Sequence, residues 1–117
     1  MKNFTYAAPT SLAEATRLIA EAPGTARVLA GGTDLIVQLR EHLRDADLVV
    51  DIKKVPEVME CKLSATGFHL GAAVPCYLLY DNADISAKYS ALTDAARIIG
   101  GWQIQSRASI GGELCNS

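Results

Sequence analysis

The 117-residue sequence predicts an α+β fold, with a small parallel α/β layer followed by a region that contains an antiparallel hairpin. Strand-like and helix-like patterns alternate from residue 3 to residue 52, which is typical of parallel strands joined by helices. After Pro56, short alternating runs around Thr66-Gly67 replace that order, which is typical of a β-hairpin. The change of pattern predicts two subdomains, residues 1–54 and residues 55–117.

The elements of the first subdomain can be assigned one by one. Residues 3–7 alternate weakly and predict a strand. Ser11 and Glu14 have the spacing of a capping box, so a helix is expected to begin at residue 12. Residues 26–29 form a short apolar run typical of a buried strand, and residues 47–52 predict a third strand.

Between the second and third strands lies the run Leu29-Ala30-Gly31-Gly32-Thr33-Asp34-Leu35, which leads into a helix marked by Ile36, Leu39 and Leu43. Paired glycines let a ligand approach the main chain without a Cβ in the way. The first N–H groups of a helix are unpaired and favour a phosphate. A glycine turn that binds nothing remains an alternative at this point.

The polar residues near this turn have different expected roles. Thr33 adds a hydroxyl donor, whereas Asp34 would repel phosphate and is expected to cap the helix or face away. The turn lacks the third glycine of the dinucleotide-binding fingerprint. Asp51 nevertheless ends the next apolar run, where a ribose-binding acid would lie.

In the second subdomain, residues 61–65 and 68–72 predict the two hairpin strands. Pro75 favours a helix through residue 80, because proline suits the first helical position. Residues 81–84 have the composition of a turn, and an apolar stripe over residues 92–99 predicts a helix ended by two glycines.

Composition excludes several functional classes. Half of the residues are apolar, 21% are charged and the net charge is −2, with scattered basic residues, so neither a nucleic-acid surface nor a membrane span is expected. No signal-peptide pattern is visible, which favours the cytoplasm. Cys61, Cys76 and Cys115 lack disulfide or metal spacing, and the first two are expected in the core. His42 and His69 have no partner at ligand spacing and are interpreted as structural or surface residues.

A second glycine pair lies in Ser109-Ile110-Gly111-Gly112-Glu113-Leu114-Cys115-Asn116. It repeats the features of the first segment, with a small apolar residue, a hydroxyl and two glycines. Two such loops could converge and hold an extended diphosphate from both sides through backbone N–H groups.

Taken together, the two glycine segments resemble those of the FAD-binding (medium) subunit of molybdenum-containing hydroxylases, of the xanthine dehydrogenase type. The likeness spans essentially the whole chain. Asp51, Leu70-Gly71-Ala72 and Gln103-Ile104 support it.

The resemblance implies a vanillyl-alcohol-oxidase-type FAD-binding fold, whose second subdomain is the start of a mainly antiparallel one. FAD would lie between the subdomains, with its pyrophosphate held by the two glycine loops and Ala72 and Ala73 facing the cofactor. The cofactor-binding residues implied in this way are Leu29, Ala30, Gly31, Gly32, Thr33, Asp34, Leu35, Ile36, Gln103, Ser109, Ile110, Gly111, Gly112 and Glu113.

The same resemblance implies an FAD-dependent oxidoreductase subunit that is incomplete on its own. A large subunit would carry the molybdenum cofactor and a small one the 2Fe-2S clusters, from which electrons pass through FAD to NAD+ or another acceptor. This chain would contribute no metal ligand and no catalytic side chain. Two alternatives remain: a cofactor-free interaction module of the same fold, and another nucleotide-binding enzyme that uses the first layer alone.

Three features depart from the family pattern. Glu113 stands where asparagine is common, and Gln105-Ser106 replaces a frequent arginine-asparagine pair. The sequence also ends at Ser117, whereas the family pattern continues into further strands. We therefore expect a fragment of a longer chain that binds FAD poorly alone, because antiparallel strands need their neighbours.

Overall fold

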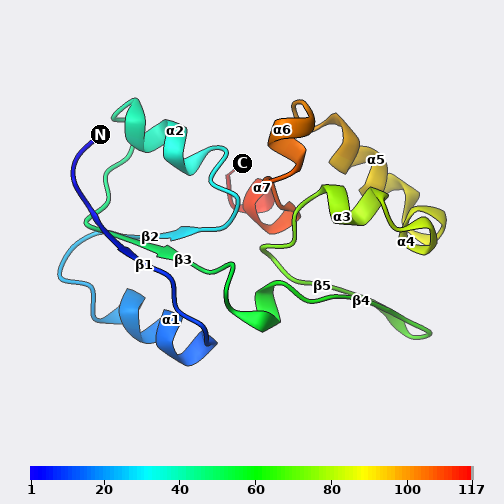
Figure 1. Cartoon of the computed structure of the whole chain (residues 1–117), viewed down its shortest axis with the longest axis horizontal. Helices are drawn as coiled ribbons and strands as arrows, with labels where there is room; N and C mark the ends of the chain where they lie inside the picture. The colour runs from blue at the N-terminus through cyan, green and yellow to red at the C-terminus, as the bar shows by residue number, and fades with distance from the viewer. Residues whose placement is uncertain (117) are drawn as a thin grey trace.

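The computed structural model describes residues 1–116 and shows a parallel sheet and an antiparallel sheet, each with its own helices (Figure 1). The α+β class predicted from the sequence is confirmed. The parallel sheet belongs to the N-terminal half and the hairpin to the C-terminal half. The boundary at residues 54 and 55 stays a prediction.

The parallel sheet has the order β1-β3-β2, with β1 at Thr5–Ala7, β2 at Ala26–Leu29 and β3 at Leu48–Asp51. The central strand β3 is buried along its whole length. This burial explains its almost continuous apolar run, because a central parallel strand is covered on both faces.

Successive residues of β3 face opposite sides of the sheet, and a different helix covers each side (Figure 1). Val50 packs in one cluster with Ala15 of α1 (Leu12–Ala20). Val49 packs in another with Leu39 of α2 (Leu35–Arg40). The sheet is thus enclosed between α1 and α2.

The two helices differ in how well the sequence predicted them. Ser11 caps α1 as predicted, since its Oγ accepts a hydrogen bond from the Glu14 N–H at 3.2 Å. The prediction that the second helix reaches Leu43 is wrong, because α2 ends at Arg40 and Leu43 is exposed. His42 has a φ of 57° and turns the chain out of the helix.

The predicted hairpin is confirmed as β4 (Cys61–Ser64) and β5 (Gly67–Leu70), preceded by a 3₁₀ turn, η1, at Pro56–Val58. Its turn lies at residues 65 and 66, one residue earlier than expected. Cys61 is exposed on β4, so its predicted core position is wrong, whereas Cys76 is fully buried as expected.

Within the described residues, five short helices follow the hairpin. The buried core of this half consists of Cys76, Leu79, Ala96 and Ala108. The turn expected at residues 81–84 is confirmed only at residue 81, because a helix begins at residue 83, where the Asn82 side chain accepts hydrogen bonds from the Asp84 and Ile85 N–H groups. The helices are α3 (Tyr77–Tyr80), α4 (Ala83–Lys88), α5 (Ser90–Ile98), α6 (Trp102–Gln105) and α7 (Ile110–Asn116).

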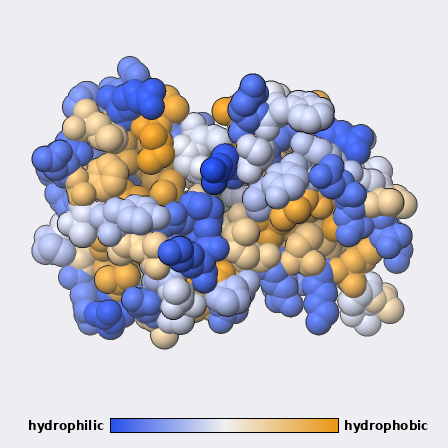
Figure 2. Space-filling view, in the orientation of Figure 1, coloured by the Kyte–Doolittle hydropathy of each residue, from blue (hydrophilic) through white to orange (hydrophobic). Residues whose placement is uncertain are grey.

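Figure 2 shows apolar surface gathered in two areas of this face, one over the parallel layer and one over the helical half, with hydrophilic residues between them. Within residues 1–116, no helix is long and apolar enough to span a bilayer.

Candidate functional site

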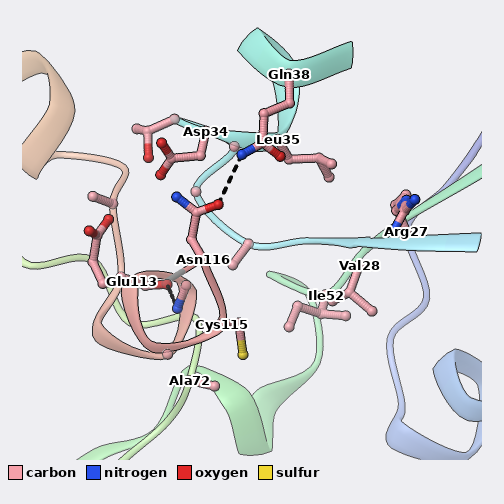
Figure 3. Close-up of a pocket in the computed structure, with 18 of the residues that line it drawn as sticks. Arg27, Val28, Asp34, Leu35, Gln38, Ile52, Ala72, Glu113, Cys115 and Asn116 are labelled. Atoms are coloured by element: carbon pink, nitrogen blue, oxygen red, sulfur yellow. Dashed lines mark hydrogen bonds between the residues drawn. The ribbon is translucent and has the colours of Figure 1, made fainter. Parts of the chain in front are cut away.

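A cavity of about 370 Å³ lies between the two glycine-rich segments (Figure 3). Its volume falls in the range of small-molecule sites, about 300–1,000 Å³. Ala72, from the connection after the hairpin, also lines it. The lining residues that belong to the predicted set are Ala30, Gly31, Gly32, Thr33, Asp34, Leu35, Ser109, Gly111, Gly112 and Glu113.

The remaining residues of the predicted set lie outside the cavity lining. Leu29 is buried beside β3, and Ile36 packs against the same cluster. Ile110 packs against the core of the helical half. Gln103 is exposed on α6, and Ala73, expected to face the cofactor, is buried elsewhere.

Two of the four glycines let one stretch of main chain pack against another. A Cβ on Gly31 would overlap the backbone carbonyl of Arg107, and a Cβ on Gly111 would overlap the backbone of Ala72. These glycines are needed to close the two halves on each other. Both glycines also line the cavity, so the interpretation that they leave room for a ligand stays a prediction.

The other two glycines have different surroundings. Gly32 has a φ of 81°, a conformation that favours glycine. A Cβ on Gly112 would meet only the Ser109 Oγ, at 3.0 Å, and otherwise open space. The second glycine segment is also not the loop expected, because it forms the first turn of α7, where the Gly112 N–H donates to the Ser109 Oγ at 3.1 Å.

Several backbone N–H groups of the first segment have no hydrogen-bond partner within the described part of the chain. Among the hydrogen bonds found within residues 1–116, none uses the N–H group of Gly31, Gly32 or Thr33. Clustered N–H groups that have no partner in the protein form a concavity suited to an anion. This arrangement fits a diphosphate better than an apolar ligand.

Two basic side chains, Arg27 and Arg44, and two acidic side chains, Asp34 and Glu113, line the cavity. Figure 3 shows Asp34 and Glu113 on one side and Arg27 at the far end. Asp34 makes no side-chain capping bond to α2 and lines the cavity, so the expectation that it caps the helix or faces away is wrong. Both acidic groups oppose an anion near the glycines.

Asp51 does not line the cavity, although its position suggested a ribose-binding acid. Its carboxylate accepts hydrogen bonds from the Tyr6 hydroxyl at 2.6 Å and the Lys53 ammonium at 2.7 Å. Burial by itself raises the pKa of Asp51, but these hydrogen bonds outweigh it and leave the pKa below its usual value. Asp51 is therefore a paired structural carboxylate.

Sequence reasoning missed two contacts around the cavity. The Lys53 Nζ donates to the Ala30 carbonyl at 2.7 Å, and the Gln38 amide donates to Asn116 at 3.0 Å, which joins α2 to α7 (Figure 3). The only sequence signal for Lys53 is its position directly after the predicted third strand. Nothing in the sequence paired Gln38 with Asn116.

A second, larger cavity of about 670 Å³ lies among α3, α5 and α6 and contains no predicted site residue. Gln105, which departs from the family pattern, lines it. This side chain accepts a hydrogen bond from Tyr80 at 2.8 Å and donates to the Arg97 carbonyl at 2.6 Å, so it ties three helices together.

The fold and the cavity define a mixed α/β domain with a cleft suited to a diphosphate-bearing cofactor. Residues 2–117 match the family described as the FAD binding domain in molybdopterin dehydrogenase. The chain belongs to this family, and the expectations of a vanillyl-alcohol-oxidase-type flavin fold and of FAD as the cofactor of the family are confirmed.

Curated relatives and solved structures agree with this assignment. The chain is 32% identical to the nicotinate dehydrogenase FAD-subunit of Eubacterium barkeri over 100% of its own length and 40% of the relative. It is 35% identical to the xanthine dehydrogenase FAD-binding subunit of Escherichia coli O157:H7, covering 95% of itself and 38% of the relative.

Among solved structures, carbon monoxide dehydrogenase from Hydrogenophaga pseudoflava, in a form lacking the Mo-pyranopterin moiety of the molybdenum cofactor, has a TM-score of 0.91 at 27% identity. That match covers 97% of this chain and 39% of the other. The chain thus spans about 40% of the length of the relatives it matches.

Proposed function

We propose that this chain binds FAD with the diphosphate in the cavity between residues 30–35 and 109–113. The observation that carries the proposal is that Gly31 and Gly112, far apart in the sequence, line the same cavity. The backbone donors of the first segment that have no partner among residues 1–116 support a diphosphate at this place.

The chain's own residues would bind and orient the cofactor. The N–H groups of Gly31, Gly32 and Thr33 and the Thr33 hydroxyl would donate to phosphate oxygens. Gly112 would leave room for the phosphates on the other side, because a side chain there would extend into open space. FAD, when bound, supplies the electron-transfer chemistry.

We further propose that the chain serves a multi-subunit oxidoreductase. A large subunit would hold the molybdenum cofactor, and a small subunit would pass electrons from 2Fe-2S clusters to FAD and then to NAD+ or another acceptor. The relatives are FAD subunits of dehydrogenases, which supports this arrangement. We propose a xanthine dehydrogenase-like complex, and the first test compares xanthine with nicotinate as its substrate.

The three free cysteines favour a reducing compartment such as the cytoplasm for this protein.

A cofactor-free interaction module of the same fold is the second candidate. Asp34 and Glu113 favour it, since both carboxylates line the cavity beside the glycines. A nucleotide-binding enzyme that uses the first layer alone is less well supported, because Gly31 packs directly against the Arg107 backbone of the second half.

The deciding experiment is a flavin absorption spectrum of the purified full-length protein, followed by FAD titration of a Gly112→Val variant. Gly112 is a better target than Gly32, whose positive φ strains any side chain regardless of ligand. Gly67→Val is the matched control, because a Cβ at Gly67 has no atom within 4 Å.

We expect a flavin spectrum from the wild type, loss of FAD from the Gly112 variant, and retention by the control. A wild type without flavin would favour the interaction module. Full FAD retention by Gly112→Val would place the diphosphate elsewhere.

A further inference from the structure

We propose that Lys53 is a positioning residue for the cofactor, which orients the first glycine segment while Asp51 and Tyr6 hold it in place. This inference rests on the proposed function. It gives a function to the side chains of Tyr6, Asp51 and Lys53, which do not line the cavity.

The contacts form a chain that begins at the sheet and ends at the glycines. The Tyr6 hydroxyl, on β1, donates to one carboxylate oxygen of Asp51, at the end of β3. The other oxygen accepts from the Lys53 Nζ at 2.7 Å and from the Lys53 N–H at 3.1 Å. The same Nζ then donates to the Ala30 carbonyl at 2.7 Å.

The hydrogen bond to Ala30 fixes the orientation of a peptide group of the proposed site. The Ala30 carbonyl and the Gly31 N–H belong to one peptide plane, and the peptide bonds described here are all trans. In a trans peptide these two groups point in opposite directions. When Lys53 holds the carbonyl, the Gly31 N–H is therefore directed away from Lys53.

The side chains of Lys53 and Asp51 are partly buried and paired with each other. The Lys53 side chain is 28% exposed and that of Asp51 11%, so the pair is more sheltered than a surface ion pair. Neither residue lines the cavity. Because the ammonium is neutralised by Asp51, Lys53 would act through the Ala30 backbone rather than as a phosphate-binding charge.

The test is FAD affinity of the full-length protein after removal of its flavin, measured by quenching of flavin fluorescence. Lys53→Met keeps much of the aliphatic stem but removes the donor. Lys54→Met is the matched control, because it makes the same change at the next, exposed residue. Lys53→Arg retains a donor and serves as the rescue variant.

We expect Lys53→Met to weaken FAD binding about tenfold, the equivalent of about 1.4 kcal/mol. ADP, used as a competing diphosphate probe, should lose affinity by a similar factor. Lys54→Met should match the wild type, and Lys53→Arg should recover most of the loss. Together these results would support a positioning role.

The outcomes separate the two proposals. A wild type that binds no FAD would overturn the proposed function and this inference with it. A wild type that binds FAD, with Lys53→Met equal to Lys54→Met, would overturn the positioning role alone. A third outcome is that Lys53→Met weakens FAD binding, Lys53→Arg does not restore it, and the flavin-free Lys53→Met protein melts at a lower temperature. Lys53 would then only stabilise the fold, and the positioning role would also be overturned.

Discussion

Glu113 is the residue whose replacement should strengthen cofactor binding. It lies in the first turn of α7 and lines the cavity on the same side as Asp34 (Figure 3). A carboxylate here opposes the negative charge of a diphosphate. We expect Glu113→Gln, which preserves the shape of the side chain, to increase the affinity for FAD.

The magnitude follows from Coulomb's law. Two unit charges about 6 Å apart, at an effective dielectric constant of about 40, repel each other by about 1.4 kcal/mol. That energy corresponds to about a tenfold change in dissociation constant. The gain should shrink as salt is added, because the cavity is open to solvent and mobile ions screen such charges.

Glu113→Gln should make the flavin-free protein less stable, although it increases the affinity for FAD. A carboxylate in the first turn of a helix interacts favourably with the unpaired N–H groups there, by about 0.3–1 kcal/mol. Glu113→Gln should therefore lower the free energy of unfolding slightly while it tightens FAD binding. A higher affinity for FAD together with a lower free energy of unfolding would show that the gain in affinity does not come from a more stable fold.

The assay is FAD titration at low and high salt, with Glu57→Gln as the control. Glu57 is exposed on η1 and does not line the cavity, so its loss makes the same change in net charge elsewhere. Equal affinities for the two variants would refute the reasoning, since they would mean that the Glu113 carboxylate does not face the diphosphate.

Two further predictions concern stability. Gly31→Ala should lower the free energy of unfolding, measured by chemical denaturation, by about 1–3 kcal/mol, because the new Cβ would overlap backbone atoms. Gly67→Ala has open space around its Cβ and should remain within about 0.5 kcal/mol of wild type. The pKa of Asp51 is lowered in the folded state, so its contribution to stability is present above the unfolded pKa of about 3.9 and is lost as pH falls through the lower folded value. The difference in unfolding free energy between wild type and Asp51→Asn should therefore shrink as the pH is lowered below about 4, and a difference that is constant between pH 7 and pH 3 would contradict this assignment.

Local patterns were sufficient to predict the elements that their own residues determine. The Ser11 cap and the two hairpin strands follow from capping and alternation over a few residues. The end of α2 did not follow, because Leu43 continues the apolar spacing while the left-handed conformation of His42 is invisible in such a pattern. The position of Asp51 suggests a ribose-binding acid, but its partners Tyr6 and Lys53 are set by the tertiary fold and are invisible in local patterns.

The second glycine segment shows why tertiary contacts overrode local preference. Glycine within a helix is less favourable than alanine by about 1 kcal/mol, which is why a loop was expected at Gly111 and Gly112. The structure forms a helix there, and the Ala72 backbone approaches Gly111 so closely that no side chain would fit. Glycine is therefore required at this position by tertiary packing despite its low helix propensity.

The paired glycines therefore divide into two tasks that the sequence alone could not separate. Gly31 and Gly111 let the N-terminal and C-terminal halves meet backbone to backbone, and this contact builds the wall of the cavity. Gly112 faces the space that the wall encloses. A side chain at Gly31 should thus disturb the assembly of the site before any ligand arrives, whereas one at Gly112 should leave the fold in place and obstruct the ligand. Comparing unfolding and FAD affinity for substitutions at these two positions distinguishes a glycine required by the protein from a glycine required by its cofactor.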